Sequence, residues 1–94
     1  MTFLKVPWSL SNNRSFNYNG VPVVIGVLRY NAISDRYYFS ITVGLRKFDG
    51  IALVSGVDLL EPFSTGLPPL YAFNTIVPLA DPNPDNLILV FQEA

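Results

Sequence analysis

The chain of 94 residues contains neither cysteine nor histidine. Without cysteine, disulfide bonds and thiolate metal sites are excluded, and without histidine the chain lacks the usual general base at neutral pH and the commonest metal ligand. Catalytic systems of the Ser-His-Asp and Cys-His types are therefore impossible within it. We predict a protein that is not an enzyme and that has no catalytic residues, no cofactor and no metal site.

Charge is also scarce in this sequence. Charged residues make up 14% of the chain and hydrophobic residues 50%, whereas soluble domains carry about 25% charged residues. The formal net charge of -1 provides no general attraction for nucleic acid or for anionic membranes. A small monomer with so much apolar and aromatic area would expose adhesive patches, so we expect much of its surface to be buried against other chains.

A long apolar helix is not expected either. Residues 62–80 are uncharged and approach the length of a membrane span, but an interior proline costs a helix about 3 kcal/mol. This run contains four prolines: Pro62, Pro68, Pro69 and Pro78. The first eight residues also lack the charged segment and long apolar run of a signal peptide. We therefore expect no membrane partner, and synthesis and assembly in the cytoplasm.

The dominant pattern in the sequence is that of β-strands. Residues 36–43 show the clearest alternation, with Tyr37, Phe39, Ile41 and Val43 on one face and Arg36, Tyr38, Ser40 and Thr42 on the other. Before them, Asn19-Gly20 fits a two-residue hairpin turn between strands at 15–18 and 21–30, because both residues tolerate positive φ. These features predict half-buried antiparallel strands.

The remaining segments extend the same pattern. Further strands are expected at 2–8, 51–57, 70–77 and 87–91, with turns or loops at 31–35, 44–50 and 81–86. The last strand is apolar on both faces, which indicates a central position. Asp58 is placed to cap a short helical turn by accepting backbone N–H groups.

Taken together, these segments predict an all-β fold. We expect one domain over residues 1–94, a small barrel or sandwich of about six mostly antiparallel strands with at most a short helical turn. Residues 1–14 are expected to form an arm or an edge strand.

The acidic residues mostly accompany glycine, proline or asparagine, where turn formation accounts for them. Four residues follow the spacing of the ligands in a calcium loop: Asp81, Asn83, Asp85 and Gln92. However, Asn86 replaces the required glycine, Gln92 lacks a bidentate carboxylate, and a strand is expected where the loop needs a helix. We predict a turn and no calcium site.

Basic and tyrosine residues leave one alternative open. Arginines, a lysine and several tyrosines lie near the expected strands, as on small barrels that bind glycans or single-stranded nucleic acid. In a β domain such tyrosines are usually cross-strand packing pairs, and the negative net charge disfavours nucleic acid. A ligand-binding β module is therefore the alternative interpretation.

A resemblance to a known family rests on the order of several motifs. Tyr30-Asn31 is followed by a turn, by the aromatic strand of residues 35–41, by Asp49-Gly50 and by the apolar run 51–60, which ends in Gly-Val-Asp-Leu-Leu. This order resembles the baseplate plug family of contractile-tailed bacteriophages of the cyanophage type, over residues 20–93. The chain departs from the family pattern at 44–48, which is basic where an acidic or neutral turn is expected.

The resemblance implies a structural protein of the virion. Such a plug would lie at the central hub of the tail baseplate, in several copies, and join the hub and spike to the tube and wedge proteins, with assembly in the host cytoplasm. We expect no nucleic acid and no membrane among its partners. Interface residues are predicted among aromatic and basic side chains outside the clearest core face: Trp8, Arg36, Tyr38, Arg46, Lys47 and Phe63.

Overall fold

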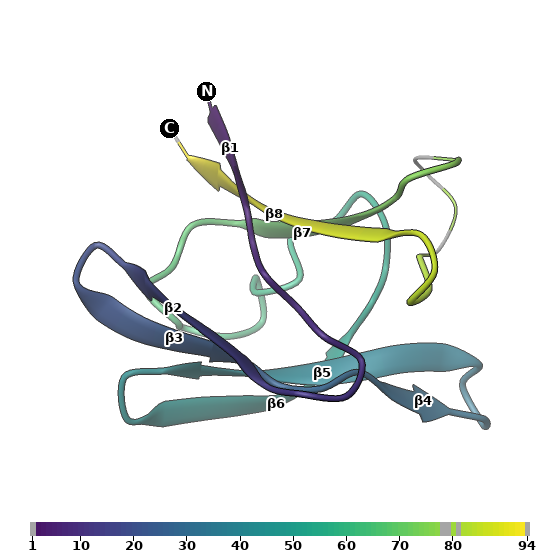
Figure 1. Ribbon diagram of the computed structural model, residues 1–94, viewed down its shortest axis with the longest axis horizontal. Coiled ribbons are helices and arrows are strands. Elements are labelled where there is room, and N and C mark those ends of the chain that lie inside the picture. Colours follow the sequence, from purple (N-terminus) through teal and green to yellow (C-terminus); the bar gives the residue numbers. More distant parts are fainter. Residues whose placement is uncertain (1, 78–79, 81, 94) are drawn as a thin grey trace. The chain divides into compact units, whose positions relative to one another are not determined.

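The computed structural model describes residues 2–77, 80 and 82–93, and these residues form strands, turns and loops without a helix (Figure 1). The strands are β1 (Thr2–Lys5), β2 (Arg14–Tyr18), β3 (Val21–Ile25), β4 (Arg29–Asn31), β5 (Arg36–Val43), β6 (Arg46–Ala52), β7 (Leu70–Asn74) and β8 (Leu87–Glu93). They form two sheets, of three and five strands, in which every pair of neighbouring strands is antiparallel. The predicted all-β fold of mostly antiparallel strands is confirmed.

The chain divides into two compact units. One unit consists of Met1–Val6 with Leu53–Ala94 and contains the three-stranded sheet, in the order β1-β8-β7. The other consists of Pro7–Ala52 and contains the five-stranded sheet, in the order β2-β3-β5-β4 with β6 also paired to β5.

The five-stranded sheet begins with the hairpin that the sequence predicts. Asn19 and Gly20 have φ angles of 49° and 81°, and Tyr18 pairs with Val21 on either side of them. Two consecutive residues with positive φ match the twist of a two-residue hairpin. The prediction for Asn19-Gly20 is confirmed.

The predicted strand at 21–30 is wrong in its length, because it is divided at Gly26. β3 pairs with the end of β5 near Ile41, whereas β4 pairs with the beginning of β5 near Tyr38. Both strands lie on the same edge of β5, since β6 pairs with both regions from the other edge. Gly26 is buried, and its N–H donates to the Ser40 carbonyl over 2.8 Å.

The predicted loop at 44–50 is also wrong. Gly44, with a φ of 61°, makes a two-residue turn with Leu45, so β6 begins at Arg46 and ends at Ala52. Asp49 and Gly50 lie inside β6, where two residues face Ser40 and form a β-bulge; Gly50 has the positive φ of 73° that such a bulge accommodates. Only Ile51 and Ala52 of the strand expected at 51–57 belong to this strand.

The predicted alternation of β5 is confirmed. Cross-strand pairing puts Ile25 beside Ile41 and Ile51 beside Phe39 on one face of the sheet. All four side chains are buried, as is that of Val23. Burial of each such side chain contributes about 1.5 to 3 kcal/mol to folding, which explains why this face determines the register.

In the three-stranded sheet β8 is central, as its apolar sequence predicts, and β1 is an edge strand. The buried face carries Leu70, Ala72, Leu87, Leu89 and Phe91. β7 ends at Asn74, earlier than the expected 77, because the Asn74 side chain accepts N–H groups from Ile76 and Val77 and turns the chain.

The cap predicted at Asp58 is present, but the element that it stabilises is not a helix. Asp58 Oδ1 accepts the N–H of Leu60 over 3.0 Å and the N–H of Leu70, the first residue of β7, over 3.1 Å. The following residues form turns, with the Phe63 N–H donating to the Leu60 carbonyl. Asp58 thus joins a turn to the start of a strand.

No helix of the described residues is long and apolar enough to cross a membrane.

Candidate binding surfaces

The structure places five of the six predicted interface residues in the unit Pro7–Ala52 and Phe63 in the other unit. Trp8 is half-buried and precedes the polar turn in which Ser9 Oγ accepts backbone N–H groups. Phe63 is half-buried in the turns that follow Asp58. Neither of these two side chains lines the hollows described below.

Three of the predicted residues share the face of β5 opposite to the buried one, which we call the outer face. Arg36 and Tyr38 lie two residues apart on β5 and therefore point to the same face. Lys47 points to this face as well, because it pairs with Thr42. Arg46 pairs with Val43 and therefore projects from the other face, where its guanidinium carbon lies 5.0 Å from the centre of the Phe48 ring. The structure thus separates Arg46 from Lys47, although they are neighbours in sequence.

A hollow of about 450 Å³ lies on the outer face. Ser40 lies at its centre, between Gly26 of the neighbouring chain segment and Gly50 of the bulge, and all three line it. Two glycines leave room where other residues would place side chains. A Cβ on Gly26 would overlap the Ser40 hydroxyl, so this space depends on glycine.

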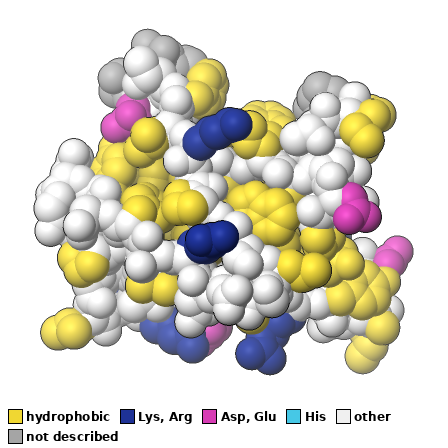
Figure 2. Space-filling view, viewed as in Figure 1, with side chains coloured by type: hydrophobic (Ala, Val, Ile, Leu, Met, Phe, Trp, Pro, Cys, Tyr) yellow, Lys and Arg dark blue, Asp and Glu magenta, His cyan; other side chains and the backbone are white. Residues whose placement is uncertain are grey.

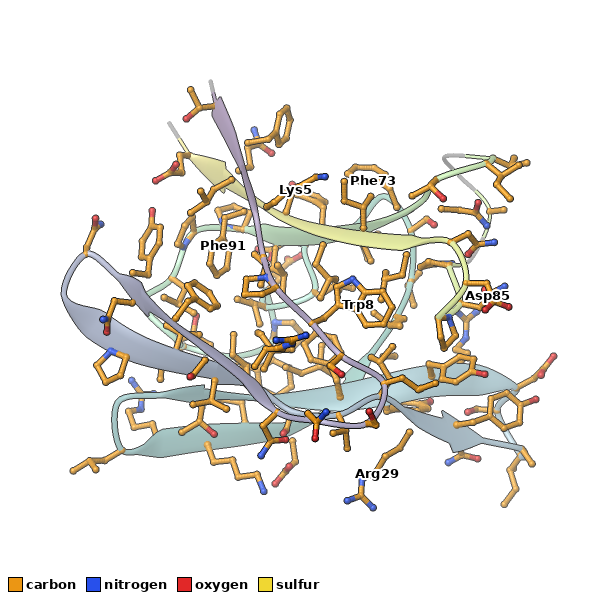
Figure 3. The ribbon with its side chains drawn as sticks, in the orientation of Figure 1. Lys5, Trp8, Arg29, Phe73, Asp85 and Phe91 are labelled. Carbon is orange, nitrogen blue, oxygen red and sulfur yellow. The ribbon has the colours of Figure 1, made fainter. Side chains whose placement is uncertain are left out.

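The rim of this hollow is polar and charged. Arg29, Lys47 and Asp49 line it together with Tyr38. Lys47 Nζ lies 3.6 Å from Asp49 Oδ1, so each neutralises the other. Arg29 makes no side-chain hydrogen bond or ion pair with another described residue, and Figure 3 shows its side chain extending away from the five-stranded sheet. The net charge of the rim is therefore that of Arg29.

A second, more open hollow adjoins the first and shares Arg29, Tyr38 and Gly50 with it. Its other lining residues belong to β4 and the turn that follows: Tyr30, Asn31, Ala32 and Ile33. Asn31 Oδ1 accepts the N–H of Ile33 over 2.9 Å, and the Tyr38 hydroxyl donates to Ser34 Oγ over 3.1 Å. These bonds hold the turn in place beside the hollow.

Tyr30 also ties this turn to β4. Its hydroxyl donates a hydrogen bond to Asp35, which raises the pKa of Tyr30 above its ordinary value near 10 because the bond stabilises the neutral phenol and the carboxylate repels a phenolate. The Tyr30 ring centre lies 5.1 Å from that of its cross-strand partner Tyr37. The tyrosine pairing expected from the sequence is present here.

The three-stranded sheet carries a surface that the sequence-based list of interface residues missed. The face opposite to the buried one presents Phe3, Tyr71, Phe73 and Ile88, which we call the aromatic face, with Lys5 and Gln92 at its β1 side. Phe3 is 59% exposed, and the others are half-buried. The rings of Tyr71 and Phe73 stack with their centres 6.2 Å apart. Alternation in residues 70–77 and the doubly apolar last strand were the signals that could have identified it.

Charged residues make up only 14% of the chain. Figure 2 shows the few basic and acidic side chains scattered among apolar and uncharged ones. In the described part of the chain, no three of the residues Asp, Glu, His and Cys gather where they could hold a metal ion. The calcium-loop spacing involves Asp81, which lies outside the described residues; Asn83 and Asn86 join each other by backbone and side-chain hydrogen bonds in a turn.

No protein-family model and no curated protein matches this chain.

Proposed function

We propose that this protein is a structural assembly component that binds other proteins through the aromatic face of its three-stranded sheet. The supporting observation is that the second face of this sheet is largely apolar, although Lys5 and Gln92 also lie on it. An antiparallel sheet with one face on a core normally presents polar side chains on the other, whereas here the second face carries Phe3, Tyr71, Phe73 and Ile88. Aromatic side chains are also the residues that most often dominate the energy of protein interfaces.

Within this class, the finer proposal is a plug of a contractile phage tail baseplate. It rests on the motif order of residues 20–93 and on the scarcity of charge. In that role several copies would fill the junction between hub, tube and wedge proteins in the virion, and the chain would act mechanically, without catalysis. Burial of the apolar area would contribute about 25 cal/mol per Å², offset by the cost of association.

Co-elution with the neighbouring hub protein on size exclusion tests this proposal. The wild-type protein should form a complex at micromolar concentrations, and replacement of Phe3 by Ser should weaken it, since Phe3 is exposed on an edge strand and its loss leaves the core intact. Leu45→Ser is the matched control, because Leu45 is fully exposed at a turn of the other sheet. Separate elution of the wild-type protein and the hub protein would refute the plug assignment.

The polar hollow on the outer face supports a second candidate function, the binding of a glycan or of single-stranded nucleic acid. Arg29, Tyr38 and Lys47 supply a cation, an aromatic ring and hydrogen-bond donors around about 450 Å³, within the range of small-ligand sites. Glycan-array and electrophoretic screens test it: a binder that loses affinity on Arg29→Gln substitution would favour this function, and the absence of any binder would remove it.

A further inference from the structure

The two hollows on the outer face form one continuous groove, since Arg29, Tyr38 and Gly50 line both of them. β4 borders one side of the groove, and β5 and then β6 with Gly50 lie on its paired side. In the sheet order β4 is terminal and pairs only with β5. Its other edge pairs with no strand of the described residues, so backbone N–H and C=O groups between Arg29 and Asn31 face outward. Such an edge can pair with an added extended segment.

The charge in the groove favours a partner with one carboxylate. Lys47 is neutralised by Asp49 at 3.6 Å, whereas Arg29 has no side-chain partner among the described residues. A guanidinium binds a carboxylate through two parallel N–H···O bonds. Because Arg29 belongs to β4, a carboxylate bound to it would lie close to the open edge of that strand.

Next to this cation the groove becomes apolar. The second hollow is lined by Ala32 and Ile33, and the Ile33 side chain is 98% exposed. The turn that holds Ile33 is fixed by the hydrogen bonds from the Ile33 N–H to Asn31 and from Tyr38 to Ser34. An exposed aliphatic side chain on a fixed turn offers an apolar contact within one or two residues of the carboxylate site.

We propose that this groove binds an extended segment of a partner protein in which an acidic side chain and an apolar one lie two residues apart, so that both point to the same face. The segment pairs with the open edge of β4, its carboxylate binds Arg29, and its apolar side chain packs on Ile33. An open strand edge and an aliphatic contact suit a peptide better than a sugar, because a sugar has no backbone to pair with β4. This inference rests on the proposed assembly role, since it names the chemistry of a protein partner.

NMR titration tests the inference directly, since a chain of 10.5 kDa gives well-resolved amide spectra. The probe is the blocked pentapeptide acetyl-Thr-Glu-Thr-Leu-Thr-amide, added to millimolar concentrations, with versions containing Gln for Glu or Ser for Leu as controls. We expect shifts of the amide signals of β4 and Ile33, and weaker binding of both control peptides. The Arg29→Gln variant should lose about two- to fivefold in affinity, as one partly exposed charge pair contributes.

Arg14→Gln is the matched variant control, because Arg14 is an exposed arginine on β2 of the same sheet that lines neither hollow. It should bind the peptide as the wild type does. Absence of shifts at β4, equal binding of the Glu and Gln peptides, or equal loss in both arginine variants would overturn the inference. Stronger shifts of the same signals by glucuronic acid than by the peptide would overturn it in favour of a glycan.

The two proposals fail separately. If the protein co-elutes with the hub protein but the peptide does not bind, only the groove inference is lost. If the peptide binds at Arg29 but the protein forms no complex with the hub protein, the baseplate assignment is lost and the groove remains.

Discussion

Asp58 shows how one carboxylate can connect two segments of the chain. Its Oδ1 accepts backbone N–H groups from Leu60 and from Leu70, which are ten residues apart in sequence. Both donors belong to buried residues. Without the carboxylate oxygen these N–H groups would lose their partner in a place where water does not easily replace it.

We expect Asp58→Ala to lower the free energy of unfolding by about 1 to 3 kcal/mol, because two backbone donors become unsatisfied. Asp58→Asn should cost less, since the amide oxygen can still accept both bonds. Chemical denaturation measures both. Asp85→Ala serves as the control, because Asp85 is an exposed turn residue; similar losses in Asp58→Ala and Asp85→Ala would contradict the assigned role.

Tyr30 provides a prediction that depends on pH. The pKa of Tyr30 is raised, first by its hydrogen bond to Asp35. A raised folded-state pKa means that this contact stabilises the fold fully below the ordinary tyrosine pKa, near 10, and that the contribution is lost as the pH rises through the folded-state value.

Phenolate absorbance in an alkaline titration should therefore show that one of the five tyrosines ionises later in the wild type than in Asp35→Asn. Asparagine suits this test because Asp35 has a φ of 54°, which asparagine also tolerates. Coinciding titration curves for the two proteins would show that Asp35 does not raise the pKa of Tyr30.

At the scale of the strands, Gly26 packs closely against Ser40 of β5, just beyond the end of β3. A Cβ on Gly26 would overlap the Ser40 hydroxyl. Gly26→Ala should therefore destabilise the protein by about 1 to 3 kcal/mol, the usual cost of overpacking. In a Ser40→Ala background the same substitution should cost clearly less, because the hydroxyl is gone. Thermal or chemical unfolding of the four proteins measures this, and an equal cost in both backgrounds would refute the contact.

Strands whose signals are local could be predicted from the sequence, and those that depend on distant pairing could not. The Asn19-Gly20 turn and the alternation of β5 depend on neighbouring residues, and both were predicted correctly. Asp49-Gly50 carries an equally strong turn signal, but pairing with β5 keeps it inside β6 as a bulge. The close packing of Gly26 likewise involves Ser40, fourteen residues away in sequence.

The candidate surfaces also depend on distant pairing, which the sequence does not reveal. Tyr38 and Lys47 were predicted as surface residues, but their meeting in one hollow depends on the register between β5 and β6, which no local pattern reveals. Arg46 was predicted together with Lys47 because both are basic. It pairs with Val43, however, and therefore projects from the other face. The aromatic face was missed because its residues come from the two ends of the chain, β1 on one side and β7 with β8 on the other.

For the whole molecule, the proposed association is driven by apolar burial, and a net charge of -1 contributes little. Co-elution with the hub protein should therefore persist between about 0.05 M and 1 M salt, over which screening lengths fall from above 10 Å to about 3 Å. Peptide binding at Arg29 should weaken over the same range, because it depends on an exposed charge pair. Size exclusion and NMR titration at both salt concentrations separate the two, and loss of the hub complex at high salt would contradict an apolar interface.

A cryo-EM map of the intact contractile tail tests the central claim most directly. The account predicts density for this chain in several copies at the hub of the baseplate, with Phe3, Tyr71 and Phe73 in contact with another chain. Density that leaves this aromatic face in solvent would contradict the proposed interface, and a complete baseplate map without this chain would contradict the assembly role itself.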